Sequence, residues 1–207
     1  MTTGVTDFLN NLTAEWETIK QQVTKYFDDE SRIREDGAVE IFKRPWIAPQ
    51  NFGIILFPPV DKSFFIKFKE DTKISIPTFY QDILLKMNGC FVFDFELFGL
   101  PKSVYTTGLL DRTTTQQLDL GSANKFWKNS YKLNKNLFYI GARAYSFDEN
   151  IGYFIDEETI YSIRTNGEVI ATWTTFDSFL VAEIKLAEKM MLEEKEEQQK
   201  TPPSIKI

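Results

Sequence analysis

The sequence predicts a single α+β domain, residues 1–191, in which a twisted antiparallel sheet has helices packed against it. Three observations lead to this prediction. Apolar residues recur at helical spacing near both ends of the chain, in residues 8–27 and 176–191. Between them lie short segments in which apolar and polar residues alternate, which is typical of half-buried strands. The turn Thr165-Asn166-Gly167 joins two such segments, as in an antiparallel hairpin with both central φ angles positive.

Residues 76–99 are expected to form the central packing unit. Pro77 fits the first turn of a helix, where a backbone N–H has no partner to lose. Apolar residues then recur at helical spacing until Asn88 and Gly89, which tolerate the left-handed backbone of a helix end. Residues 90–99 follow at once and are strongly apolar, so we expect one core strand directly after the helix.

The N-terminal part, residues 6–69, is expected to add one helix and three strands to this unit. Thr6 is placed to cap a helix whose apolar stripe continues as far as Phe27. Residues 28–37 are acidic but lack the alternating oxygen ligands of a calcium-binding loop, so a solvated linker is expected. The predicted strands are Val39–Lys43, 52–57 and 64–68.

The C-terminal part is predicted to hold a short helix, an antiparallel meander and a long last helix. Residues 102–117 are polar and irregular, which indicates an exposed loop. Asp119 is placed to cap the short helix and Thr174 the last one. Residues 192–207 are expected to be the polar end of that helix and a disordered tail. The predicted strands are 137–140, ending at Gly141, then 152–156, Thr159–Arg164 and Val169–Trp173.

The composition excludes several kinds of site. The 207 residues include no histidine and one cysteine, Cys90, so neither a histidine-dependent catalytic triad nor a cysteine-cluster metal site is possible. We therefore expect no cofactor and no metal. No segment is apolar over the length of a membrane helix and the first residues do not resemble a signal peptide, so we expect a cytoplasmic protein with no membrane contact. The net charge of −6 disfavours nucleic acid and suits either solubility alone or a basic protein partner.

Two groups of residues are candidates for a functional site. Asp94 and Glu96 alternate with phenylalanines and so are expected on one face of the core strand, either as a general acid–base pair or as the polar side of a half-buried strand. Arg143 and Tyr145, with Tyr153, make a second group, because Arg and Tyr are favoured in protein interfaces. The alternative for this group is an ordinary sheet surface.

The order of several short motifs resembles the SUKH superfamily. They are the Ile-Pro and Asn-Gly pairs that bound the central helix, the aromatic strand ending in Leu-Phe-Gly, and a later Ile-Gly. The strand that begins at Tyr153, the pair Ile160-Tyr161 and the closing run from Trp173 to Leu180 follow in the same order. The resemblance covers about residues 76–187, and residues 39–69 are an addition to it.

This resemblance implies a SUKH-like sheet and a protein-binding role without catalytic residues. The superfamily includes fungal regulators of cell-wall glucan synthesis and many bacterial immunity proteins against polymorphic toxins. We therefore expect an immunity-type protein that binds a toxin domain, with a regulatory scaffold for wall or envelope synthesis as the alternative and a carboxylate-dependent glycan hydrolase as a further one. The expected partner contacts are Asp94, Glu96, Arg143, Tyr145 and Tyr161, and the expected structural residues are Pro77, Asn88, Gly89, Gly141 and Trp173.

Overall fold

The structure is a computed structural model that describes Asp7 and residues 17–48, 51–101, 118–127, 130–133, 137–146 and 149–200. In these ranges one antiparallel sheet has nine strands, each paired with the next along the chain. The strands are β1 (Arg32–Ile33), β2 (Val39–Lys43), β3 (Phe52–Leu56), β4 (Cys90–Val92), β5 (Phe95–Leu97), β6 (Phe138–Ser146), β7 (Glu149–Asp156), β8 (Thr159–Arg164) and β9 (Val169–Trp173). The helices are α2 (Glu17–Thr24), α3 (Ser63–Thr72), α4 (Thr78–Leu84), α5 (Leu120–Phe126) and α6 (Phe176–Lys200).

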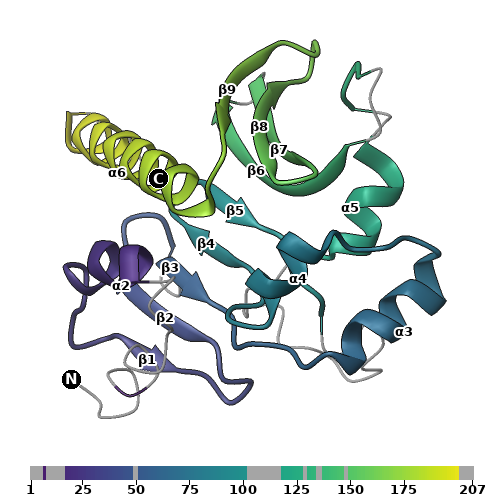
Figure 1. Cartoon of the computed structure of the whole chain (residues 1–207). Helices are drawn as coiled ribbons and strands as arrows, with labels where there is room; N and C mark the ends of the chain where they lie inside the picture. The colour runs from purple at the N-terminus through teal and green to yellow at the C-terminus, as the bar shows by residue number, and fades with distance from the viewer. Residues whose placement is uncertain are drawn as a thin grey trace, which may run out of the picture.

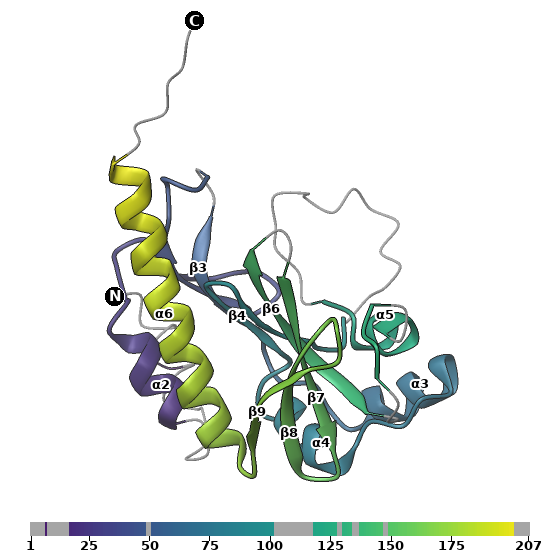
Figure 2. The ribbon, with the colours of Figure 1, turned by 90° about the horizontal axis from the view of Figure 1, so that it is seen from above.

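The helices lie on different sides of the sheet. Figures 1 and 2 show α6 along one side of strands β6 to β9 and α5 on the opposite side. Helix α2 lies beside α6, where Lys25 and Tyr26 both bond to Glu188. Helices and an antiparallel sheet in one chain confirm the α+β class. None of the described helices is long and apolar enough to cross a membrane.

A single large apolar cluster extends from the first described helix to the last. It includes Ile19 and Val23 of α2, strand residues such as Phe95 and Tyr153, and Met191 of α6, all of them buried. Burying this much aromatic and aliphatic surface is the main driving force for folding, at roughly 25 cal/mol for each Å² removed from water. Helices α2 and α6, the first and last that the structure describes, therefore contribute to the same core.

Residues 64–68 form part of helix α3, so the prediction of a strand there is wrong. The Asp61 side chain accepts a hydrogen bond from the Ser63 backbone N–H at 2.8 Å, which satisfies one of the unpaired donors at the helix start. Phe64 and Phe68 lie four residues apart and pack inward, whereas Ile66 is 65% exposed. Over so short a segment, the spacing of the phenylalanines is compatible with the period of a strand and with that of a helix.

Residues 90–99 form a hairpin and not one strand. Val92 of β4 pairs with Phe95 of β5, which leaves Phe93 and Asp94 as the two turn residues. Phe93 has a left-handed backbone with φ of 60°, and its N–H donates to Gly53 of β3 at 2.6 Å. The Phe93 ring packs edge-on against Tyr26 at 5.3 Å, so tertiary contacts support a conformation that phenylalanine rarely adopts.

Four smaller features also differ from the predictions. The segment expected to be only a linker contains β1, and β6 continues past Gly141 to Ser146. The hairpin turn at Asn166 has positive φ only at Gly167, which gives a type I turn followed by a bulge. The cap of α6 is Thr175 and not Thr174, because the Thr175 hydroxyl oxygen accepts from the Ser178 N–H at 3.2 Å.

Most other element predictions are confirmed. Strands are present at Val39–Lys43, Thr159–Arg164 and Val169–Trp173, and strands also cover most of residues 52–57 and 152–156. The Asp119 carboxylate caps α5 by accepting from the backbone of Gly121 and Ser122. The Thr6 cap, the loop 102–117 and the tail 201–207 lie outside the described residues.

Candidate functional site

Strand β5 separates the two candidate carboxylates. Phe95 is paired with Arg143, and paired residues point to the same side of a sheet, while neighbours along a strand point to opposite sides. The Phe95 ring packs on Phe179 of α6 at 5.7 Å, so we call this side the α6 face. Asp94 bonds to Arg143 on that face, whereas Glu96 points to the opposite side, the α5 face. The prediction that Asp94 and Glu96 share one strand face is therefore wrong.

On the α6 face, four side chains form what we call the arginine cluster: Arg143, Asp94, Tyr153 and Glu183. Arg143 Nη1 donates to Asp94 Oδ1 at 2.8 Å, and Arg143 Nε donates to Tyr153 Oη at 2.9 Å. Its Nη2 lies 3.0 Å from Glu183 Oε2 and also donates to the Glu183 carbonyl. The Tyr153 hydroxyl donates in turn to Glu183 Oε2. One guanidinium thus ties a strand, a turn and α6 together.

The charges of the arginine cluster stabilise one another. Burial alone lowers the pKa of the Arg143 guanidinium, but Tyr153, Asp94 and Glu183 raise it by more, so the pKa stays above its usual value. Burial raises the pKa of Asp94, and the charge of Arg143 opposes that rise. Arg143 is only 1% exposed and its donors are bonded within the cluster, so we correct its expected role in partner contact to one in the core.

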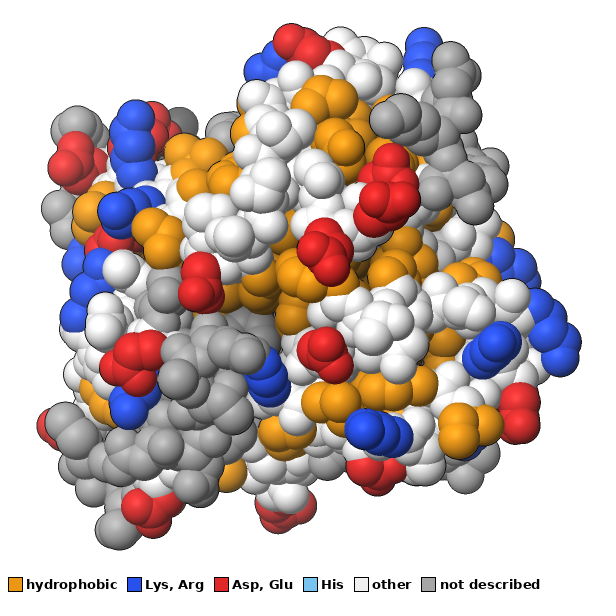
Figure 3. Space-filling model, viewed as in Figure 1, with side chains coloured by type: hydrophobic (Ala, Val, Ile, Leu, Met, Phe, Trp, Pro, Cys, Tyr) orange, Lys and Arg blue, Asp and Glu red, His pale blue; other side chains and the backbone are white. Residues whose placement is uncertain are grey.

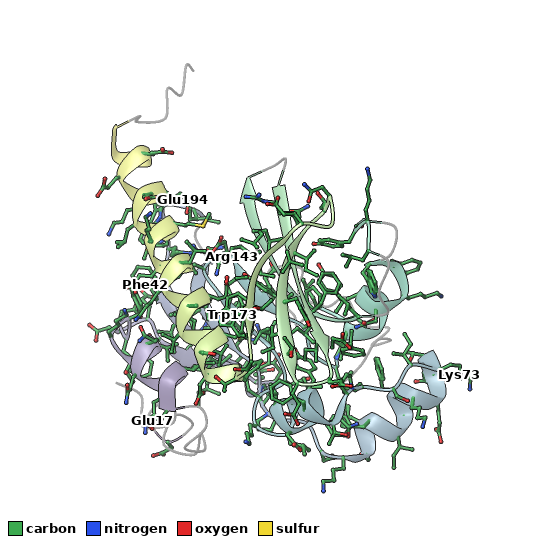
Figure 4. The ribbon with its side chains drawn as sticks, turned by 45° about the horizontal axis from the view of Figure 1, so that its top comes forward. Glu17, Phe42, Lys73, Arg143, Trp173 and Glu194 are labelled. Carbon is green, nitrogen blue, oxygen red and sulfur yellow. The ribbon has the colours of Figure 1, made fainter. Side chains whose placement is uncertain are left out.

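A groove runs beside the arginine cluster, between the last turns of α6 and the Phe93-Asp94 turn. Its volume is about 470 Å³, and we call it the acidic groove. Four of its side chains are carboxylates, four are apolar and one is an arginine. They are Asp94, Glu193, Glu194 and Glu197, then Ile47, Phe93, Met190 and Met191, and Arg44. Figure 4 shows Glu194 on α6 and Arg143 of β6 beside that helix.

One feature of the acidic groove attracts a cation, and a second opposes it. Asp94 Oδ2 is buried and has no hydrogen-bond partner among the described residues, although its Oδ1 is bonded to Arg143. A buried acceptor left unpaired costs about 1–3 kcal/mol, which a suitable donor would recover. Arg44 carries the positive charge of the groove; burial lowers its pKa, while Glu194 and Asp94 act in the opposite direction.

On the α5 face, Glu96 lies in a second hollow of about 390 Å³, which we call the aromatic pocket. Its lining is mainly rings and other apolar side chains contributed by β5, β6, α5 and the residues next to α5. Besides Glu96 the lining residues are Phe98, Leu118, Ala123, Phe126, Trp127, Ser130, Tyr131, Tyr139, Ala142, Arg143, Asn150 and Thr165.

The walls of the aromatic pocket are held in place by specific contacts. Asn124 of α5 donates to the Tyr139 carbonyl and accepts from the Tyr139 N–H, both at 2.8 Å, which fixes α5 against β6. Tyr139 stacks on Phe154 at 4.7 Å, and Tyr131 packs edge-on against both. Gly152 leaves the necessary space, because a Cβ there would lie 2.8 Å from the Tyr131 ring.

Glu96 has an unusual electrostatic environment in this pocket. Burial raises its pKa to about 7, and repulsion by Asp94 adds to the rise. No hydrogen bond or ion pair of its carboxylate occurs within the ranges that the structure describes. Glu96 is therefore a half-buried carboxylate whose charge is not compensated.

The other two expected contact residues are Tyr145 and Tyr161. The side chain of Tyr145, in β6, lies outside the described residues. Tyr161 of β8 is half-buried against the core and is paired with Phe154 and Thr172. The structure thus does not bring Tyr161 to either hollow.

The five expected structural residues support the region around α4 and the sheet. Pro77 precedes the first turn of α4, and the fully buried Asn88 amide exchanges two hydrogen bonds of 2.7 Å with the backbone of Leu100. Gly89 has φ of 84°, and a Cβ there would lie 2.5 Å from a carbonyl oxygen, so glycine is required. Gly141 lies opposite Leu97 in the β5–β6 pair, and the Trp173 ring packs on Phe179 at 5.2 Å.

Sequence reasoning missed most residues of both hollows. Glu193 and Glu197 belong to the part of α6 that was expected to be its polar end, and Met190 lies just before that part. The spacing of three and four residues places all three on one helix face. That spacing was the available signal. The aromatic pocket had no such signal, because Phe98, Tyr131 and Tyr139 come from three separate segments.

Comparisons with protein-family models, curated proteins and solved structures found no match to this chain. Among the described residues, no group of three or more His, Cys, Asp and Glu side chains is arranged to hold a metal ion. The two hollows and their charges therefore carry the functional argument.

Proposed function

We propose that this chain is a protein-binding module whose acidic groove holds a basic and partly apolar segment of another protein. The observation that carries the proposal is the composition of the groove. Carboxylates of Asp94, Glu193 and Glu197 lie beside Met190 and Met191, so one surface offers both charge and apolar contact. Methionine side chains adapt to differently shaped apolar partners, which suits such a surface.

Charge supports the same role during association. The net charge of −6 attracts a basic partner at long range, and fixed carboxylates then orient it at the groove. On the face shown in Figure 3, Lys and Arg side chains lie mainly toward the left and right edges, while acidic side chains are scattered among hydrophobic ones nearer the centre.

The partner that we propose is a basic toxin domain, which makes the chain an immunity-type protein of the cytoplasm. The motif order that resembles the SUKH superfamily supports this, together with the antiparallel sheet covered by helices. In this proposal the chain is SUKH-like and not an enzyme. The separation of Asp94 from Glu96 removes the specific observation that favoured a glycan hydrolase.

The test is an affinity capture from the native organism with three forms of the full chain. One is the natural sequence, the second carries Glu193→Lys and Glu197→Lys in the groove, and the third carries Glu70→Lys and Glu158→Lys. All four glutamates are exposed, so these variants are expected to fold. The two double variants change the net charge equally, but only the form with Glu193→Lys and Glu197→Lys changes the groove.

We expect one basic, toxin-like protein to be captured by the natural chain and the third form and lost by the second. With the purified partner, association should slow as salt rises, because salt screens charge steering. Equal loss from both variants would mean that only overall charge matters and would contradict the groove. An envelope-synthesis enzyme as the captured partner would replace the immunity role with the regulatory scaffold.

A further inference from the structure

The aromatic pocket contains a charge that no described residue around it compensates. Glu96 is half-buried, its pKa is raised by burial and by Asp94, and no donor in the described part of the chain reaches it. Arg143 also lines the pocket, but its donors are used by Asp94, Tyr153 and Glu183 on the other face. The proposed role of the acidic groove does not use Glu96 at all.

The surroundings of this carboxylate are those that favour an organic cation. Aromatic rings attract a cation to their faces, and the attraction is strongest where water is excluded. Trp127, Tyr131 and Tyr139 are at least nine-tenths buried, so they form rigid walls, while Phe126 and Leu118 are 54% and 43% exposed at the rim. A volume of about 390 Å³ is within the range of small-molecule sites.

We propose that the aromatic pocket binds a small organic ammonium ion, with its charged head on the Glu96 carboxylate and its apolar body against the rings. The ammonium N–H groups would supply the donors that Glu96 lacks. Trp127, Tyr131 and Tyr139 would contact the apolar body, and Phe126 would cover it at the rim. Binding is reversible and involves no bond-making step.

Protonation of Glu96 gives the proposal a pH signature. Burial keeps the hydroxyls of Tyr131 and Tyr139 protonated because it raises their pKa values, and it raises the pKa of the nearby Cys90 thiol to about 12. Arg143 stays charged because its pKa is raised. Asp94 also has a raised pKa and repels the Glu96 carboxylate. Affinity for the cation should therefore rise from pH 6 to pH 8 as Glu96 ionises.

The test uses phenethylammonium chloride as the probe and the full chain, titrated by amide NMR at pH 6 and pH 8. The neutral control is 3-phenylpropan-1-ol, which has an aromatic body and no charge. We expect saturable shifts around the pocket, with affinity at pH 8 exceeding that at pH 6. Glu96→Gln keeps the shape of the side chain and removes its charge, and it should weaken binding of the cation about tenfold or more, because hydrogen bonds to a charged group are the strong ones.

Two further comparisons separate the pocket from general charge attraction. Glu158→Gln removes an exposed carboxylate far along the sheet and should leave the affinity unchanged. Phe126→Leu alters only the exposed rim, so it should fold and should weaken the probe severalfold. The proposal is overturned if the shifts do not saturate, if the neutral alcohol binds as tightly as the cation, or if Glu96→Gln binds the cation as the natural chain does.

Discussion

At β5 and β6, the charge on one face of the sheet has bonded partners, whereas the charge on the other face has none among the described residues. On the α6 face, Arg143 is completely buried, yet Asp94, Tyr153 and Glu183 bond to it. On the α5 face, Glu96 is less deeply buried and has no bonded partner in the described ranges. The comparison teaches that depth of burial alone does not distinguish a structural charge from a candidate binding charge, whereas the presence or absence of bonded partners does.

This difference follows from what each face is packed against. Helix α6 is long and brings both the carboxylate and the carbonyl of Glu183 to the sheet, so the buried charge is matched by a rigid element. Helix α5 has seven residues and is tied to the sheet through Asn124, which leaves the hollow beside Glu96. We interpret the first face as structural and the second as a place where a ligand completes the charge balance.

The largest expected change in stability comes from removing Arg143 from the α6 face. Arg143→Met removes the cation that Asp94 and Glu183 share in the described part of the chain and leaves one buried and one half-buried carboxylate. Breaking a buried pair in this way costs about 3–5 kcal/mol in the free energy of unfolding. Urea unfolding at neutral pH, followed by circular dichroism, measures this loss.

A second variant shows whether the loss reflects uncompensated charge. Arg143→Met combined with Glu183→Leu removes an anion as well and replaces the pair by apolar groups, which is often tolerated. It should recover a substantial part of the loss. If the double variant is less stable than the single one, compensation of charge does not explain how the α6 face is stabilised.

On the α5 face, removing the charge of Glu96 should raise the free energy of unfolding, whereas removing Arg143 lowers it. Because the pKa of Glu96 is raised from 4.5 to about 7, the folded chain favours the protonated form. Its contribution is fully present below pH 4.5 and is lost as the pH rises to about 7. Glu96→Gln removes this loss, so relative to the natural chain the variant should gain up to about 3 kcal/mol of unfolding free energy between these pH values.

Urea unfolding at a series of pH values measures that gain, with Glu158→Gln as the control for an exposed glutamate. The control should follow the natural chain at every pH. A Glu96→Gln variant that is less stable than the natural chain at pH 8 would show that Glu96 has a stabilising partner, and the contrast between the faces would be lost.

A pair of tyrosines tests the contrast with matched substitutions. Tyr153→Phe removes a hydroxyl that is bonded to both Arg143 and Glu183 and should cost about 2 kcal/mol, because its partners are charged. Tyr139→Phe removes a hydroxyl whose neighbour is the Tyr131 hydroxyl at 3.3 Å and should cost about 1 kcal/mol or less. Thermal and urea unfolding of both variants checks this order, and equal costs would contradict it.

Local signals in the sequence predicted much of the meander and fewer of the tertiary features. Asp119 indicates a helix cap by its residue type, and the segment around Gly167 indicates a turn. The sequence therefore predicted α5 and the β8–β9 hairpin. The Phe93-Asp94 turn was not, because its left-handed phenylalanine is held by Gly53 and Tyr26, which are far away in sequence.

The candidate site shows the same limit. Asp94 and Glu96 were selected as candidate site residues, but period-two alternation placed them on one face because it assumed one unbroken strand. Arg143 was expected at the surface, since a lone arginine in a strand carries no sign of the distant Glu183 that compensates it. Burial and compensation depend on the assembled fold, and one sequence does not display them.

The smallest expected effect concerns the start of α6, which sets where Glu183 meets the arginine cluster. Thr175→Ala removes the side-chain acceptor of the Ser178 N–H and should lower the free energy of unfolding by about 1 kcal/mol. Thr174→Ala is one residue earlier, equally exposed, and should change little. Urea unfolding of both variants decides between the two capping positions. Because Glu188 and the buried Phe179 also hold α6, the effect of Thr175→Ala should stay local. The affinity of the aromatic pocket for the cation should therefore be unchanged. A lower affinity in Thr175→Ala would show that the two faces are coupled through the sheet.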